Sequence, residues 1–103
     1  MIPAMFIDNR IFEERAIARS GRYKITMDGI MGPEKEPHVH VFDGGDGLAS
    51  VSVASGEVLD GEIPRDFRKR FLKWLFNRQK MLLEDWQMMQ EHKYPRDYGE
   101  IGI

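Results

Sequence analysis

The feature that most constrains the fold is a stretch from position 23 to position 59 in which apolar and polar side chains alternate with a period of two. Such alternation is typical of strands that have one buried face and one polar face. Stretches rich in glycine and proline at 29–37, 43–47 and 55–56 interrupt it, and each suits a loop or a tight turn. The pattern predicts three or four antiparallel strands with one polar face open to solvent. That face would carry Lys24, Thr26, His38, His40, Ser50 and Ser52.

The second half of the chain has the spacing of a helix. Apolar residues recur at steps of three and four between positions 67 and 89, and Pro64 suits the first helical turn because it has no N–H to leave unpaired. The predicted helix reaches about Gln90, roughly 26 residues or 39 Å. It is either continuous or broken near Asn77. We expect its apolar side to pack on the apolar face of the sheet. That side includes Trp74 and Trp86.

The first twenty residues fit two structures. Asp8 is a suitable N-cap for a helix that ends before Gly21. The same stretch fits a β-hairpin, with arms at 16–18 and 23–25 on either side of a turn at Ser20-Gly21. We expect the helix. Together these patterns predict one α+β domain over residues 1–103: a three- to four-stranded antiparallel sheet, one long C-terminal helix, whole or broken, an N-terminal helix and an irregular tail at 92–103.

Composition excludes several kinds of site. The chain has no cysteine, which rules out disulfides, thiolate metal sites and thiol nucleophiles. It has no run of 18 apolar residues, so no membrane-spanning helix is expected. The segment Met1–Asp8 lacks the basic region of a secretory signal. We therefore expect a cytoplasmic protein without membrane contact, and no cofactor is predicted.

Charge is unevenly distributed along the chain. The segment 65–80 contains seven basic residues and one acidic residue, so it carries a charge of +6, whereas the chain as a whole carries −2. On the predicted helix, four basic side chains lie opposite the apolar side, where they could follow a phosphate backbone. These candidate nucleic-acid contacts are Lys69, Arg70, Lys73 and Lys80. A solvated helix face explains the same residues.

His38 and His40 are the strongest candidates for a site. Residues two apart on a strand point the same way, so the two imidazoles should leave the polar face side by side. They could bind a partner together with Ser50 and Ser52, act as a catalytic acid and base, or hold a metal such as Zn²⁺. A metal would need a third ligand, and the candidates are Glu34, Glu36, Asp43 and His92. The alternative is that both histidines face solvent and have no functional role.

Three segments in a fixed order resemble one protein family. They are Pro37-His38-Val39-His40-Val41, the connector Gly56-Glu57-Val58-Leu59-Asp60-Gly61-Glu62-Ile63-Pro64, and Leu82-Leu83-Glu84-Asp85-Trp86. In this order, over about residues 21–91, the chain resembles the small bacterial family known as domain of unknown function 4160. The resemblance singles out His38, His40, Trp74 and Trp86. This chain departs from the family pattern at Glu34-Lys35-Glu36, where members usually carry an upstream polar pair and a further proline.

Three functional hypotheses follow. Genes of the family often lie beside those of another small family, so the resemblance implies pairing with a protein partner of the toxin–antitoxin kind. The first hypothesis is therefore an interaction module that binds a protein through the face around His38 and His40. The second is a nucleic-acid binder or small ribonuclease that uses these histidines with the basic helix 65–80. The third is a metal-dependent hydrolase.

Overall fold

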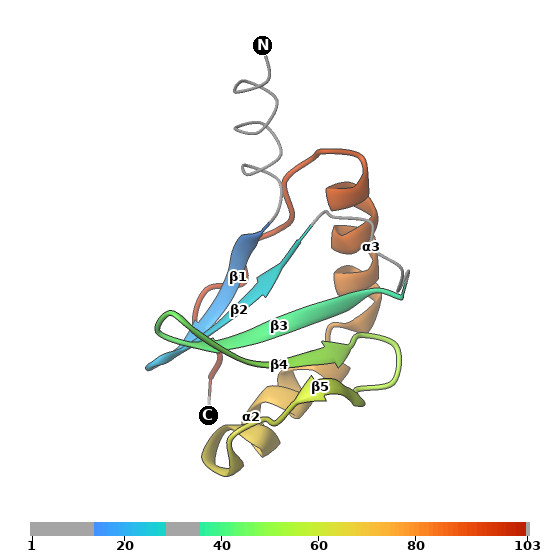
Figure 1. Cartoon of the computed structure of the whole chain (residues 1–103). Helices are drawn as coiled ribbons and strands as arrows, with labels where there is room; N and C mark the ends of the chain where they lie inside the picture. Colours follow the sequence, from blue (N-terminus) through green and yellow to red (C-terminus); the bar gives the residue numbers. More distant parts are fainter. Residues whose placement is uncertain (1–13, 29–35, 103) are drawn as a thin grey trace.

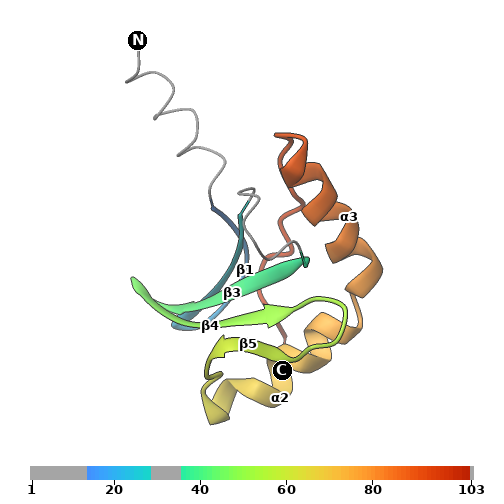
Figure 2. The same cartoon turned by 45° about the vertical axis from the view of Figure 1, so that its right-hand side comes forward.

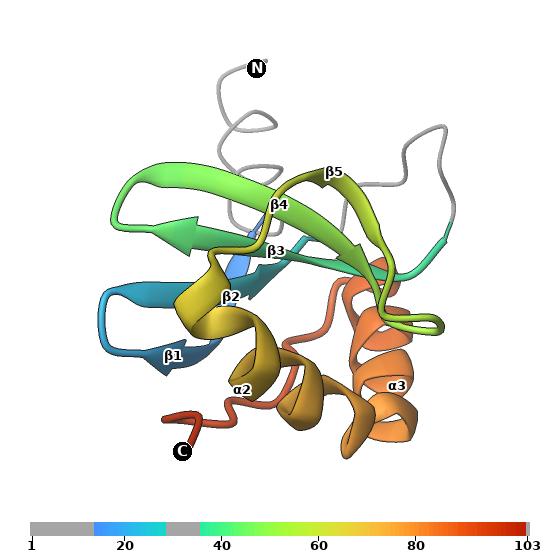
Figure 3. The same ribbon diagram turned by 90° about the horizontal axis from the view of Figure 1, so that it is seen from below.

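A computed structural model of the chain describes residues 14–28 and 36–102, which form an antiparallel sheet and two helices. The sheet contains five strands in chain order: β1 (Arg15–Ser20), β2 (Tyr23–Met27), β3 (His38–Asp43), β4 (Asp46–Ser52) and β5 (Val58–Gly61). The helices are α2 (Arg65–Phe76) and α3 (Gln79–Gln90), and both lie on the same side of the sheet (Figures 1, 2 and 3). The α+β class is confirmed, with five strands in place of three or four.

The N-terminal helix expected up to residue 20 is wrong for residues 15–20, which form β1. The hairpin alternative is correct, and its turn contains Gly21 with a φ of 59°. Residues 8–13 of the expected helix lie outside the described residues. β1 is stabilised from both edges, by β2 on one side and by a C-terminal segment on the other. On that outer edge, the Arg19 N–H donates to the Gly99 carbonyl at 2.9 Å and the Ile101 N–H donates to the Arg19 carbonyl at 2.7 Å. The tail expected to be irregular thus covers the edge of the sheet.

A continuous long helix is wrong and the alternative with a break near Asn77 is confirmed, because the chain turns at Asn77 and Arg78 between α2 and α3. A straight helix of about 39 Å would outreach a sheet whose longest strand, at about 3.4 Å per residue, spans roughly 24 Å. Gln79 fixes the new direction, since its side-chain amide donates to the carbonyls of Val53 at 2.9 Å and Ala54 at 2.8 Å. Within the described residues, neither helix is long and apolar enough to cross a membrane.

The core lies between the sheet and the helices. It contains every second residue of the central strands and the inward residues of α2 and α3. Its largest fully buried members are Phe67, Phe71, Ile17, Ile25, Met27, Leu75, Leu82 and Met89. Trp74 belongs to this core at 4% exposure, as expected. Trp86 is only partly buried and packs against the edge of the core, so its predicted core position is confirmed in part.

Replacing Trp86 with alanine should lower the free energy of unfolding by about 2 kcal/mol, less than the 3–5 kcal/mol typical of a fully buried tryptophan. For a domain of this size that loss corresponds to a melting temperature lower by about 10 °C. Leu83→Ala is the matched control on the same helix, since Leu83 is 39% exposed. Thermal unfolding followed by circular dichroism measures both. An unchanged melting temperature for Trp86→Ala would contradict the packing of this side chain against the core.

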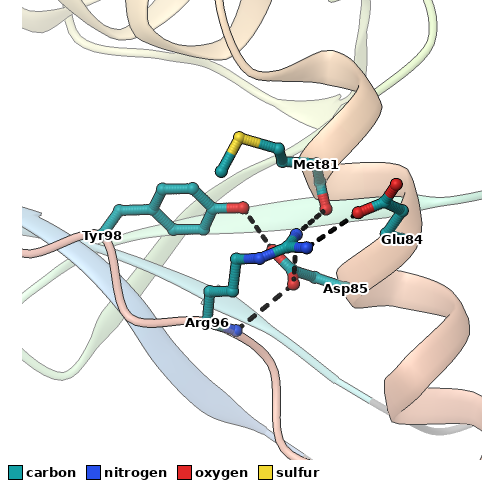
Figure 4. A network of polar contacts seen from close by, with 5 residues as sticks. All are labelled: Met81, Glu84, Asp85, Arg96 and Tyr98. Atoms are coloured by element: carbon teal, nitrogen blue, oxygen red, sulfur yellow. Dashed lines mark hydrogen bonds and ion pairs between the residues drawn. The ribbon is translucent and has the colours of Figure 1, made fainter.

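A buried carboxylate on α3 joins the C-terminal segment to the helices (Figure 4). Asp85 has 0% of its surface exposed. Its carboxylate accepts hydrogen bonds from the Arg96 guanidinium at 3.1 Å, from the Arg96 backbone N–H at 3.3 Å and from the Tyr98 hydroxyl. Burial and the hydrogen bond to Asp85 raise the pKa of the Tyr98 phenol, and Arg96 opposes that rise, so the phenol stays protonated and donates. The network holds the C-terminal segment in place along β1.

Candidate functional site

The sheet face opposite the helices carries the candidate site. Inward and outward side chains alternate on β3, so Val39 and Val41 enter the core while His38 and His40 point the other way. The register places His40 between Thr26 of β2 and Ser50 of β4, and it places His38 opposite Ser52. We refer to this side of the sheet as the outer face. No described helix covers it (Figures 2 and 3).

His40 lies in the middle of a hydrogen-bonded chain of side chains. Its Nε2 is 3.1 Å from Oδ2 of Asp28, and its Nδ1 is 3.0 Å from Oγ of Ser50. The hydrogen bond with Asp28 raises the pKa of His40, and partial burial opposes that rise. With a neutral ring, the Nε2–H donates to Asp28 and Nδ1 accepts the Ser50 hydroxyl proton. Ser50 therefore has a base within reach, which the sequence patterns did not identify.

His38 is oriented by its own backbone. Its Nδ1 lies 2.8 Å from the carbonyl oxygen of Glu36, an acceptor, so Nδ1 carries a proton. Its Nε2 makes no hydrogen bond within the part of the chain that the structure describes. The His38 and His40 rings meet edge to face with centroids 5.0 Å apart. The predicted side-by-side arrangement of the two imidazoles is confirmed.

Part of the outer face is covered by acidic side chains. The Ser52 hydroxyl donates to Glu36 at 2.5 Å, and the Thr26 hydroxyl donates to Glu14 at 3.0 Å. Thr26 and Ser52 are consequently only 2% and 1% exposed. The expectation that the whole polar face is open to solvent is wrong for these two residues. Ser52 lies beneath Glu36, whereas His38, His40 and Ser50 remain partly exposed.

The two histidines form a compact group of ligand atoms with Asp28. One ligand atom from each of Asp28, His38 and His40 lies within 4.8 Å of the others. Among the described residues, none of the third ligands expected from the sequence belongs to this group. Glu36 pairs with Ser52, Asp43 forms an ion pair with Arg22 at 2.6 Å, and His92 follows the end of α3. Glu34 lies outside the described residues. The alternation in the sequence could have indicated Asp28, because this residue continues the outward-facing positions 24 and 26 of β2, and β2 pairs with β3.

A hollow of about 290 Å³ lies next to His40 on the same face. Ser50 and Asp60 contribute polar atoms to its lining, and Phe42 and Leu48 contribute apolar surface. Asp60 reaches the hollow because β5 pairs with β4, with Asp60 opposite Ser50. The outer face therefore combines an oriented histidine pair with an adjacent depression that has polar and apolar walls.

One known family matches the part of the chain that carries these residues. The model of the family described as "Domain of unknown function (DUF4160)" matches residues 23–87. The chain belongs to this family. The matched region begins at β2 and includes all but the last residues of α3, so Asp28, His38 and His40 all lie inside it. Neither a curated protein nor a solved structure matches the chain significantly.

Two elements of this DUF4160 domain lie outside the matched region, and they contact each other. β1 precedes it and the segment at 98–101 follows it. The Tyr98 N–H donates to the Ile17 carbonyl at 2.6 Å, and Arg19 and Glu100 form a parallel bridge. These two extensions add a further strand and a partial edge cover to the sheet, on the side away from β5.

In this DUF4160 domain, the four basic residues of the predicted nucleic-acid surface lie on two helices and differ in exposure. Lys69 and Lys73 are exposed on α2, and Lys80 is exposed on α3 beyond the turn. Arg70 is held against the fold, since its guanidinium donates to Ser20 at 3.0 Å and to the Asp66 carbonyl at 3.3 Å. The helices lie on one side of the sheet (Figure 3), and the two histidines of β3 point to the other side. A single nucleic-acid strand that contacts both groups would have to pass around the sheet.

Proposed function

We propose that this DUF4160 domain is a cytoplasmic protein-interaction module that binds a protein partner through its outer face, as one half of a pair of the toxin–antitoxin kind. The observation that carries the proposal is the one-sided packing of the fold. Both helices cover one face of the sheet, and the opposite face keeps His38, His40 and Ser50 partly exposed with no described helix over them. A sheet normally packs at least one of its two faces against the core, and an antiparallel sheet can leave the other face for a partner.

Two properties of the outer face suit a protein partner. The hydrogen bonds from His40 to Asp28 and Ser50 fix the side chains before binding, so less conformational entropy is lost in a complex. The adjacent hollow has Phe42 and Leu48 in its lining, which can accept an apolar side chain, and Asp60 at its border. The proposed contact surface is His38, His40, Ser50 and the lining of this hollow. Ser52 is buried beneath Glu36 and supports that surface through its hydrogen bond to this residue.

The proposal is tested by capturing tagged protein from its native host with two double variants alongside the wild type. His38→Ala with His40→Ala removes the centre of the outer face. Lys69→Ala with Lys73→Ala removes two exposed charges on α2, on the other side of the sheet. We expect one stoichiometric protein in the eluate of the wild type and of the lysine variant, and its loss from the eluate of the histidine variant. Mass spectrometry identifies the protein, and the absorbance ratio detects nucleic acid.

The same experiment can overturn the proposal in two ways. Equal recovery of the partner by the histidine variant would place the interaction elsewhere on the surface. Recovery of nuclease-sensitive nucleic acid, lost in the lysine variant and weakened steeply by salt, would favour the nucleic-acid alternative through Lys69 and Lys73. Circular dichroism spectra of both variants check that they fold.

A further inference from the structure

We propose that Asp28, His38 and His40 form a binding site for a divalent transition metal ion, with Zn²⁺ as the ion it fits best. The site lies on the outer face where β2 ends and β3 begins, and its ligand atoms already lie within 4.8 Å of one another. Two imidazole nitrogens and one carboxylate oxygen are a donor set that Zn²⁺ and its neighbours in the first transition row prefer. The metal site does not depend on the protein partner proposed above.

The orientation of both imidazoles supports a metal site. Histidines that bind a metal usually hold the second ring nitrogen in a hydrogen bond, which fixes the tautomer and the plane of the ring. His38 uses Nδ1 for the carbonyl oxygen of Glu36, and His40 uses Nδ1 for the hydroxyl of Ser50. Each ring therefore has its supporting contact at Nδ1. The Nε2 atoms are the ligand atoms for the ion, which would replace the hydrogen bond between Nε2 of His40 and Asp28. In the metal-bound form the Nδ1–H of His40 would donate to Ser50.

Asp28 provides a second and independent observation. Its Oδ2 atom contacts His40, but its Oδ1 atom is buried and has no hydrogen-bond partner among the described residues. A buried carboxylate oxygen without a partner is costly, and a bound cation would satisfy it. The distance of 3.1 Å between Oδ2 of Asp28 and Nε2 of His40 is close to the separation of about 3.3 Å expected for two ligands at about 2.0–2.1 Å from a tetrahedral ion.

The types of ligand atom also determine which class of ion fits the site. Mg²⁺ and Ca²⁺ prefer six or more oxygen ligands, and a site with two imidazoles does not offer them. Three protein ligands leave at least one position of a tetrahedral ion open, as in sites that also bind water or a further ligand. That position is open to solvent or a partner, since all three residues are partly exposed.

Isothermal titration of the purified, chelator-treated protein with ZnCl₂ tests the site, with Co²⁺ as a spectroscopic probe of its geometry. Three variants remove one ligand each: Asp28→Asn, His38→Gln and His40→Gln. Asp28→Asn keeps an oxygen that can accept the hydrogen bond from His40, so it alters the charge with little change in packing. His92→Gln is the matched control, because His92 follows α3 and does not belong to the group.

We expect the wild type and His92→Gln to bind one Zn²⁺ per chain and each ligand variant to bind it at least tenfold more weakly. Bound Co²⁺ should give the intense visible absorption of a four-coordinate ion in the wild type and in His92→Gln, and in none of the ligand variants. Zn²⁺ should also raise the melting temperature of the wild type but not that of the ligand variants. Absence of binding by the wild type, or an equal loss in His92→Gln, would overturn the site. Partner capture repeated with chelator-treated protein separates this result from that of the proposed interaction.

Discussion

Replacement of Asp85 with alanine should lower the free energy of unfolding by about 3 kcal/mol, because removing one member of a buried ion pair typically costs 3–5 kcal/mol. Asp85 is fully buried and accepts from the Arg96 guanidinium, the Arg96 N–H and the Tyr98 hydroxyl (Figure 4). All three donors lose their acceptor in the variant. The lower end of the range applies because the Arg96 side chain is 40% exposed and can turn to water.

The neighbouring carboxylate on the same helix is the matched control. Glu84 accepts from the other nitrogen of Arg96 at 2.8 Å, but its side chain is 50% exposed. Exposed ion pairs contribute little, so Glu84→Ala should change the urea midpoint far less than Asp85→Ala. Asp85→Ala should also release the C-terminal segment from β1, seen as faster hydrogen exchange at the Arg19 amide, which donates to Gly99. Equal urea midpoints for the two variants would show that the buried network contributes nothing beyond its exposed part.

The sequence predicted those elements whose pattern is local. Alternation in β2, β3 and β4 and the glycine-rich turn between β3 and β4 are visible within a few residues, and the structure confirms them. β1 was predicted only as the alternative to a helix, because Ala16, Ile17 and Ala18 are compatible with either structure. Its strand conformation depends on two partners, β2 and the segment ending at Ile101, and the second lies some eighty residues further along the chain.

The candidate site, too, could be predicted from the sequence only where the pattern is local. The outward direction of His38 and His40 follows from strand alternation alone. Their oriented tautomers do not, because these depend on Ser50 from β4 and on the backbone at Glu36. Asp28 continues the alternation beyond Lys24 and Thr26, but its proximity to the histidines depends on the pairing of β2 with β3. Glutamates that cover Thr26 and Ser52 lie outside the strands, and no periodic pattern indicates where such side chains fold back.

Replacement of Gly61 with alanine should lower the free energy of unfolding by about 3 kcal/mol through the backbone of the sheet. Gly61 ends β5 with a φ of 76°, in the left-handed region that residues with a Cβ adopt at a cost of about 1–2 kcal/mol. A Cβ at this position would overlap the carbonyl oxygen of Leu48 and lie 2.9 Å from its carbonyl carbon. These are backbone atoms of β4, so relief of the overlap requires loss of pairing between β4 and β5.

Gly44→Ala separates the two contributions to this loss. Gly44 has a φ of 61° in the turn between β3 and β4, and a Cβ there would meet nothing within 4 Å. Gly44→Ala should lower the free energy of unfolding by the conformational cost alone, about 1 kcal/mol. The difference between the urea midpoints of the two variants then measures the overlap with Leu48. Loss of β5 pairing in Gly61→Ala would also displace Asp60 from its place opposite Ser50, at the border of the hollow next to His40. Equal stabilities of the two variants would mean that β5 can move away from β4 at no cost. In that case Asp60 could not be a fixed part of the outer face, and the proposed contact surface would reduce to residues of β3 and β4.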